Sequence, residues 1–283
     1  MGQIHLLYRV KYFTFIQVLL GTILFVRADA QTEHWDTYMA KFGDKPGSVL
    51  VDMGYKDAAP DSRYPFLVVT GPRSQDCNKQ KLPANEEIGR MEEMLDATTS
   101  FITGVTAKVL VGTFTYNCER LNYYYVKDTA GVRYAIMRLY NRNYPNYEYA
   151  INMKADREWS VYRTFLYPGD ETLNWMENDK IITKMLQQGD SLTQPRDINF
   201  ELYFKTDTGR QSFVGFMKEK GYKTDTTQIS QSPNVPYELV LTKHASVKMD
   251  TINEMTQEIK TGLKKYNSIY VGWNAPLKPL PTK

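Results

Sequence analysis

The chain has 283 residues, of which 42% are apolar and 24% are charged, and its formal net charge is +3. These values are typical of a folded protein of one or two domains and exclude a disordered or collagen-like chain. The near-neutral charge, without a run of basic residues, also argues against a nucleic-acid-binding surface, so no nucleic acid is expected among the partners.

The first 30 residues have the features of a secretory signal peptide. Arg9 and Lys11 precede a mostly apolar segment, 12–26, and Ala28-Asp29-Ala30 is a small-residue cleavage site. The apolar segment is shorter than the roughly 20 residues that span a bilayer as a helix. We therefore expect cleavage before Gln31, export to the periplasm or the extracellular space, and no stable membrane anchor afterwards. Removal of the segment lowers the formal net charge from +3 to +1.

Two cysteines, Cys77 and Cys118, occur in the chain. In an exported protein an even number of cysteines is typical of disulfide bonding, and two free thiols are the alternative. Cys118 falls in a turn between two predicted strands, and Cys77 lies in a polar loop that can reach it. We predict a Cys77–Cys118 disulfide, which would stabilise the fold by roughly 3–4 kcal/mol through loop closure.

Residues 31–168 are predicted to form an antiparallel-sheet module. Apolar residues recur at spacings of three and four from Asn85 to Ile102, which predicts one amphipathic helix. The last four predicted strands are separated by short turns, which indicates an antiparallel meander. The predicted strands are rich in β-branched and aromatic residues: 48–55, 64–70, 105–116, 119–127, 133–140 and 147–153.

The strand predicted over 119–127 is rich in tyrosine. Alternation places Tyr123 and Tyr125 on one face with Leu121, while Tyr124 and Val126 lie on the other. Tyrosine suits sheet packing, but aromatic rings on one face can also stack on sugars or bases. Tyr123 and Tyr125 are therefore candidate binding residues for a small ligand or a glycan.

Residues 156–168 close the first module. A helix is predicted from Asp156 to about Phe165, with Asp156 as its N-cap. Trp159 and Tyr162 share one face of this helix, and we consider them candidate binding residues at the junction as well as packing residues. Asp156 and Glu158 suggest capping and a surface ion pair, and a carboxylate-dependent hydrolase is the alternative.

The first module resembles a known family in the order of its segments. A Gly-Ser-Val-Leu-Val-Asp strand at 47–52 and a Tyr-Pro-Phe-Leu strand at 64–67 precede the Glu-rich helix and the Tyr-rich hairpin. The closing motif Asp-x-x-Trp-x-x-Tyr-x-x-x-Leu-Tyr-Pro spans 156–168. This order is similar to the bacterial domain of unknown function 695, over about 34–168. The resemblance implies no established activity and no catalytic residues.

Residues 169–283 are predicted to form a second module after a linker at 169–173. Its core strand, 196–204, alternates strictly between apolar and polar residues. The order of elements predicts a ferredoxin-like βαββαβ sandwich preceded by one helix, so the whole chain is expected to be α+β. The other predicted elements are helices at 173–188, 208–221 and 250–266 and strands at 222–230, 237–244 and 269–273.

Five short motifs follow one another along the second module: Gly189-Asp190, Pro195-Arg196, Tyr203-Phe204, Gly221-Tyr222 and Gly272-Trp273. Their order is similar to that in a known family, the regulator of ribonuclease E activity B, over about 174–275, with a tail at 276–283. The resemblance implies a small non-catalytic protein that inhibits an endoribonuclease by binding it. The family usually has Asp where this chain has Val271, and an exported protein would not meet a cytoplasmic ribonuclease. We therefore expect the fold and a protein-binding role, with Arg196, Tyr203 and Trp273 as candidate contacts.

The sequence contains no recognisable catalytic motif. The mature chain has two histidines, His34 and His244, and they show no metal-ligand spacing. It also lacks a glycine-rich phosphate loop, a Gly-x-Ser-x-Gly elbow and a Cys-x-x-Cys pair. We expect no cofactor, no metal and no enzymatic activity. The hypothesis is an exported two-domain protein that binds or inhibits another protein, with the tyrosine-face ligand binder and the hydrolase as alternatives.

Overall fold

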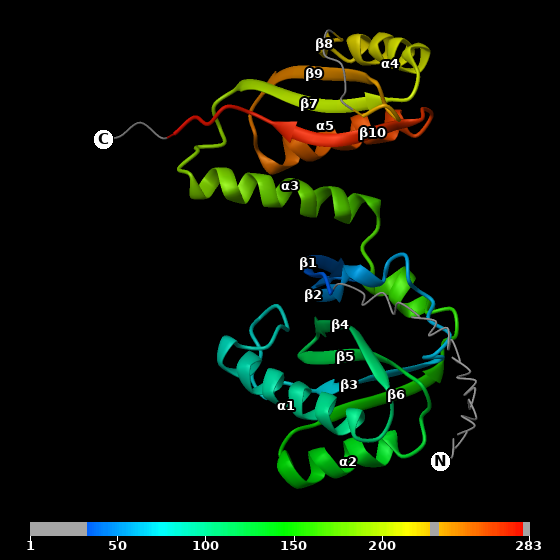
Figure 1. Cartoon of the computed structure of the whole chain (residues 1–283). Helices are drawn as coiled ribbons and strands as arrows, with labels where there is room; N and C mark the ends of the chain where they lie inside the picture. The colour runs from blue at the N-terminus through cyan, green and yellow to red at the C-terminus, as the bar shows by residue number, and fades with distance from the viewer. Residues whose placement is uncertain (1–32, 227–231, 280–283) are drawn as a thin grey trace, which may run out of the picture. The chain divides into compact units, whose positions relative to one another are not determined.

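The computed structural model describes residues 33–226 and 232–279, and the predicted signal peptide at 1–30 lies outside them. The described residues form a six-stranded and a four-stranded antiparallel sheet, each with its own helices (Figure 1). Within these ranges no helix combines the length and the apolarity that crossing a membrane requires. The α+β class predicted from the sequence is confirmed.

The first sheet has the strand order β1-β2-β4-β5-β3-β6, and every neighbouring pair is antiparallel. The turn between β4 and β5 places Asn117 and Cys118 at positive φ, which is the geometry of a two-residue hairpin loop. The strands are β1 (Trp35–Phe42), β2 (Lys45–Asp52), β3 (Phe66–Pro72), β4 (Lys108–Tyr116), β5 (Glu119–Val126) and β6 (Tyr149–Ala155), and a short 3-10 turn, η1 (Met53–Tyr55), follows β2.

The strand predicted over 133–140 is wrong, because this segment is helix α2 (Val132–Asn143). Its aromatic and β-branched residues suggested a strand, but its buried residues recur at spacings of three and four, as on one side of a helix. The predicted meander is therefore also wrong, since β3 lies between β5 and β6. The buried residues of α2 are Val132, Ile136, Leu139 and Tyr140.

Both faces of the first sheet are covered. Helix α1 (Asn85–Thr103), which matches the prediction, packs with α2 on one face, against Tyr124 and Val126 of β5. The residues after β6 pack on the other face, where they contact Tyr123 and Tyr125. The predicted alternation along this strand is confirmed. Because both faces of the sheet are covered, all four side chains are buried.

The second sheet has the order β10-β7-β9-β8 and the chain order βαββαβ, which confirms the predicted ferredoxin-like module. The segment predicted as a linker at 169–173 supplies the first turn of α3 (Asp170–Gln187), the helix that comes before the ferredoxin-like elements. The other elements are β7 (Arg196–Phe204), α4 (Asp207–Glu219), β8 (Lys223–Asp225), β9 (Tyr237–Ala245), α5 (Met249–Leu263) and β10 (Ser268–Asn274). The strand predicted over 222–230 extends beyond β8, and most of that extension lies outside the described residues.

Helices cover one face of the second sheet. The alternating apolar residues of β7 are buried against α3, α4 and α5. Burying such a side chain stabilises a fold by about 1.5–3 kcal/mol. The alternation predicted for this strand is confirmed, and its buried members are Ile198, Phe200, Leu202 and Phe204. Among the described residues, no helix packs on the opposite face.

Candidate functional site

The segment that closes the first module turns into a helix four residues later than predicted. Asp156 precedes a helical turn from Ser160 that continues as a π-helix, η2 (Tyr162–Leu166). The Asp156 carboxylate still acts as a cap, because it accepts hydrogen bonds from the amides of Ser160 at 2.9 Å and Val161 at 3.0 Å. It also accepts from the Tyr125 hydroxyl at 2.6 Å.

These contacts account for the charge state of Asp156. Burial alone would raise the pKa of its carboxyl, but the hydrogen bonds from Ser160, Tyr125 and Val161 outweigh burial and lower it. Both carboxylate oxygens are used inside the protein, which agrees with capping rather than with hydrolysis. Glu158, the second carboxylate of that hypothesis, is exposed. Within residues 33–226 and 232–279, no three side chains of metal-ligating type gather closely enough to hold an ion.

The candidate aromatic residues of the first module are buried. Trp159 stacks on Tyr125 with ring centroids 4.1 Å apart, and its indole nitrogen donates to the carbonyl of Tyr64 at 3.0 Å. The Tyr162 hydroxyl donates to the carbonyl of Asp52 at 2.8 Å. Tyr123 lies beside Phe165 in the same core. Because these four rings are buried, they present no open aromatic surface for a glycan.

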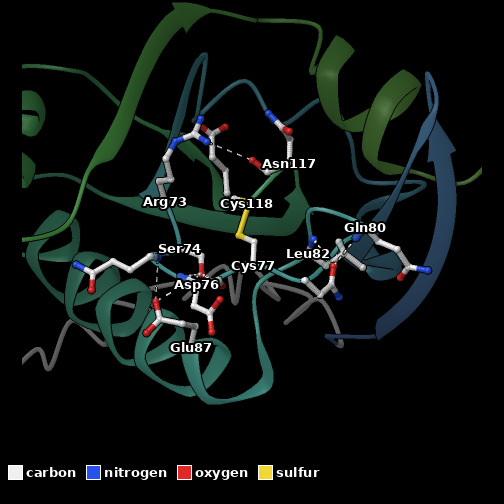
Figure 2. Close-up of a disulfide and its surroundings, with 12 residues drawn as sticks. Arg73, Ser74, Asp76, Cys77, Gln80, Leu82, Glu87, Asn117 and Cys118 are labelled. Carbon is white, nitrogen blue, oxygen red and sulfur yellow. Dashed lines mark hydrogen bonds and ion pairs between the residues drawn. A yellow bond between two sulfur atoms is a disulfide. The ribbon is translucent and has the colours of Figure 1, made fainter.

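The predicted Cys77–Cys118 disulfide is present, and it joins the loop before α1 to the β4–β5 turn (Figure 2). Backbone hydrogen bonds support the junction, since Cys118 N–H donates to Lys81 at 2.7 Å and Ser74 N–H donates to the Cys118 carbonyl at 2.7 Å. Arg73 pairs with Glu119 at 2.6 Å beside it. The disulfide therefore anchors a long polar loop to the sheet.

Arg196 is buried and forms a bidentate ion pair with Asp190, with nitrogen–oxygen distances of 2.5 and 2.9 Å. Its guanidinium also donates to the carbonyl of Pro276 at 2.9 Å. Asp190 accepts from the amides of Lys278 and Leu192. Burial opposes ionisation of Asp190, but Arg196 and these amides outweigh it and lower its pKa to about 2. The pair ties the loop after α3 to the segment after β10.

Trp273 is also buried, and its indole nitrogen donates to the amide oxygen of Asn178 at 2.9 Å. Asn178 lies on α3 and in turn donates to Thr256 on α5 at 2.8 Å. Trp273 therefore connects β10 to both helices. Like Arg196, this candidate contact residue holds the module together and presents little surface to a partner.

Tyr203 lies on the face of the second sheet that helices leave open. It is opposite Ile269 on β10 and Glu238 on β9. Ile269 is 49% exposed, and Val271, at a β-bulge in the same strand, is 51% exposed. We call Tyr203, Ile269 and Val271 the open-face apolar patch. Ile269 and Val271 were not predicted from the sequence. The usable signal was that β10 carries apolar residues on both of its sides.

Carboxylates surround the open-face apolar patch. Partial burial, then Glu201 and Asp225, raise the pKa of Glu238. The Tyr203 hydroxyl donates to Glu201, and this hydrogen bond, with burial, raises the pKa of Tyr203 to about 12. Within the described residues, strand pairing places Lys223 and His244 on this face, and the His244 ring lies 2.8 Å from Asp197. The four carboxylates on the face are Asp197, Glu201, Asp225 and Glu238. The open face is therefore acidic around an apolar centre.

Family models match the two modules separately. Residues 33–167 match a family of unknown function, DUF695, and residues 175–275 match the regulator of ribonuclease activity B, RraB. We call these two matched regions the DUF695 domain and the RraB domain. Both resemblances predicted from the sequence are confirmed, and the second domain is of a regulator type.

Other comparisons add no functional evidence. A search of curated proteins finds no match to the chain. The crystal structure of a candidate glycine cleavage system transcriptional repressor is 10% identical, and the alignment covers 75% of this chain and 98% of that one. Its TM-score is 0.21, so this likeness supports no inference.

The two domains differ in where their candidate residues lie. In the DUF695 domain, Tyr123, Tyr125, Trp159 and Tyr162 all lie in one core. In the RraB domain, Arg196 and Trp273 are buried and Tyr203 lies on the open face. The structure brings Tyr203 together with Ile269 and Val271 rather than with the other candidates.

Proposed function

We propose that the protein is an exported, non-catalytic regulator whose RraB domain binds a partner protein through the open sheet face. One observation carries the proposal, namely that Ile269 and Val271 are each about half exposed beside Tyr203 on a face with no helix over it in the described residues. Apolar side chains gathered on a flat surface and rimmed by polar groups are typical of protein interfaces.

The composition of the face supports a protein partner. Tyrosine is enriched among interface residues that contribute most to binding, because its ring buries a large area and its hydroxyl forms hydrogen bonds. The two aliphatic neighbours of Tyr203 extend this area along β10. The surrounding carboxylates form the polar rim that excludes water from such a centre.

The charge of the face selects the partner. Asp197, Glu201 and Glu238 lie on it with Asp225, and the basic residues that strand pairing places there are Lys223 and His244. An acidic face associates faster with a basic surface, and repulsion between like charges disfavours an acidic partner surface. The partner surface should therefore be basic around an apolar centre.

Export belongs to the same proposal. It is supported by the signal-peptide features of residues 1–30 and by the Cys77–Cys118 disulfide, because disulfides persist mainly in oxidising compartments. Mass spectrometry of the native protein should find Gln31 at the N-terminus. A native chain that retains residues 1–30 would contradict export by this route.

Partner binding is tested by capture with the mature protein from the exported fraction of its source cells. Ile269→Asp combined with Val271→Asp should abolish recovery of the partner, because two carboxylates would be desolvated in the interface. The control is Leu186→Asp combined with Met39→Asp, since these side chains are 52% and 51% exposed and lie elsewhere. The captured protein is then purified and titrated against the same variants. Equal binding by both double variants would refute the open face as the binding surface.

A further inference from the structure

Helix α2 of the DUF695 domain presents a basic face to solvent. Its members, which we call the basic face of α2, are Arg133, Tyr134, Met137, Arg138 and Arg142, and all five are exposed. Tyr134 is 70% exposed and Met137 is 40% exposed. With about 3.6 residues per turn, these two side chains lie between Arg133 on one side of the helix and Arg138 and Arg142 on the other. The face is therefore an apolar centre with a basic rim.

The positive charge of this face is not balanced by neighbouring carboxylates. Helix α2 contains no acidic residue. Within residues 33–226 and 232–279 none of its three arginines forms an ion pair, whereas Arg63 and Arg73 of the same domain pair with Asp61 and Glu119. The basic face of α2 thus has three unpaired guanidinium groups, which remain protonated at any physiological pH.

The open face of the RraB domain has the opposite charge around a similar centre. It carries four carboxylates and Lys223, so its formal charge is −3 when His244 is neutral. Its apolar part is the open-face apolar patch. Contact between the two surfaces would bury apolar side chains against one another and would set arginines against carboxylates, which is the complementarity that the proposed function requires of a partner.

The two surfaces also match in length. From β10 to β8 the open face changes from apolar to acidic over three strand spacings, which is about 14 Å. From Tyr134 to Arg142 the basic face of α2 spans eight residues of helix, which is about 12 Å. A helix that lies across the strands can therefore place Tyr134 over the open-face apolar patch and Arg142 over the carboxylates of Glu238 and Asp225.

We propose that the basic face of α2 in one copy of this protein occupies the open face of the RraB domain in a second copy. The inference rests on the proposed function, because it takes the open face as a binding surface and names an occupant for it. The contact joins two different surfaces, so it is head-to-tail and can repeat from copy to copy. One helix of 12 residues covers less area than a standard interface, so the association is weak and a foreign partner with a larger basic surface displaces it.

The test is sedimentation of the mature protein over a range of concentrations. The parent protein should self-associate, and an increase of NaCl from about 0.05 to about 0.5 M should weaken the association, because salt screens exposed charges. Arg138→Glu with Arg142→Glu should weaken it by at least about tenfold, since attraction becomes repulsion. Glu201→Lys with Glu238→Lys should have the same effect from the other side of the contact.

Mixing the two double variants separates lost complementarity from lost folding. In an equimolar mixture each reversed surface meets a complementary surface on the other variant. Association should therefore return to within about threefold of that of the parent protein. A variant that had failed to fold could not be rescued in this way.

Matched double variants control for the change in net charge. Arg157→Glu with Arg163→Glu and Glu219→Lys with Glu254→Lys make the same charge changes in the same two domains, at exposed side chains outside both surfaces. Each should leave self-association within about twofold of the parent value. Equal weakening by the controls and by the test variants would overturn the inference.

The capture experiment distinguishes this inference from the proposed function. The Arg138 and Arg142 double variant keeps its open face and should capture the foreign partner at least as well as the parent, whereas the Glu201 and Glu238 double variant should lose both capture and self-association. A parent protein that stays monomeric but captures a partner overturns the inference and leaves the proposed function intact. Self-association without capture supports the inference and contradicts a foreign partner. Pelleting with anionic phospholipid vesicles that depends on Arg138 and Arg142, without self-association, would assign the basic face to a membrane surface and overturn the inference.

Discussion

The two sheets of this protein differ in how many of their faces are covered. In the DUF695 domain, β5 buries consecutive residues, because helices pack on one face and the segment after β6 packs on the other. In the RraB domain, β7 buries alternate residues and leaves Tyr203 on an open face. A sheet covered twice uses its aromatic residues for packing. A sheet covered once retains a surface for recognition.

The largest effect is expected from removing a ring that covers the first sheet. Trp159→Ala deletes the stack on Tyr125 and a buried hydrogen bond and leaves a cavity, so it should destabilise the DUF695 domain by about 3–5 kcal/mol. Thermal and denaturant unfolding would measure the change. Near-parent stability of this variant would contradict the packing role that distinguishes the two sheets.

Loss of the disulfide should have a somewhat smaller effect in the same domain. Cys77→Ser with Cys118→Ser releases a loop whose ends are separated by 41 residues, which should cost about 3–4 kcal/mol through the entropy of the unfolded chain. Urea unfolding of the variant, compared with that of the oxidised parent, measures this change. Reduction should have no further effect on the variant, because it has no other cysteines.

Acid should weaken the RraB domain through Asp190. Its pKa of about 2 in the folded protein lies below the value of about 3.9 in an unfolded chain. A lowered pKa contributes stability that is present above the unfolded value and is lost as pH falls from about 4 towards 2. The double variant Asp190→Asn with Arg196→Met lacks this titration, so its unfolding free energy should fall less steeply in that pH range. Equal slopes would contradict the assignment.

The smallest effect on stability is expected on the open face. Tyr203→Ala removes a ring that no helix covers among the described residues, so it should change the unfolding free energy by no more than about 0.5 kcal/mol while weakening capture of the partner. Calorimetry and the capture experiment measure the two effects separately. A large loss of stability would mean that this face is packed, as in the first sheet.

The pH dependence of partner binding refines this comparison. The raised pKa of Glu238 keeps its carboxyl protonated to a higher pH than usual, and a basic partner prefers the ionised form. Binding should therefore strengthen as pH rises through this pKa. Glu238→Gln should flatten the profile, and an unchanged profile would exclude Glu238 from the contact.

Local periodicity predicted most of the elements. The alternation of β7 and the helical spacing of α1 both follow from burying one side of a regular element, and both are confirmed. The segment 133–140 was predicted as a strand because of its residue types. It is a helix because its apolar residues form a stripe that packs beside α1 on the sheet, a contact between distant parts of the chain.

The motifs that carried the family resemblances led to residues that hold the fold. Arg196 forms a buried ion pair and Trp273 joins β10 to α3, so both were correct as landmarks of the RraB domain. Whether they contact a partner could not be read from residue type, because arginine and tryptophan are common both in interfaces and in buried networks.

The sequence by itself determined the division into two family domains, the α+β class, the pairing of the two cysteines and the buried side of β7, because each follows from residue type or from local periodicity. The tertiary structure alone decided that Tyr123 and Tyr125 are enclosed, while Ile269 and Val271 are about half exposed and Tyr203 is partly exposed. The physical reason is that exposure depends on what packs above a residue. Segments far away in the chain supply that cover on both faces of one sheet and on one face of the other.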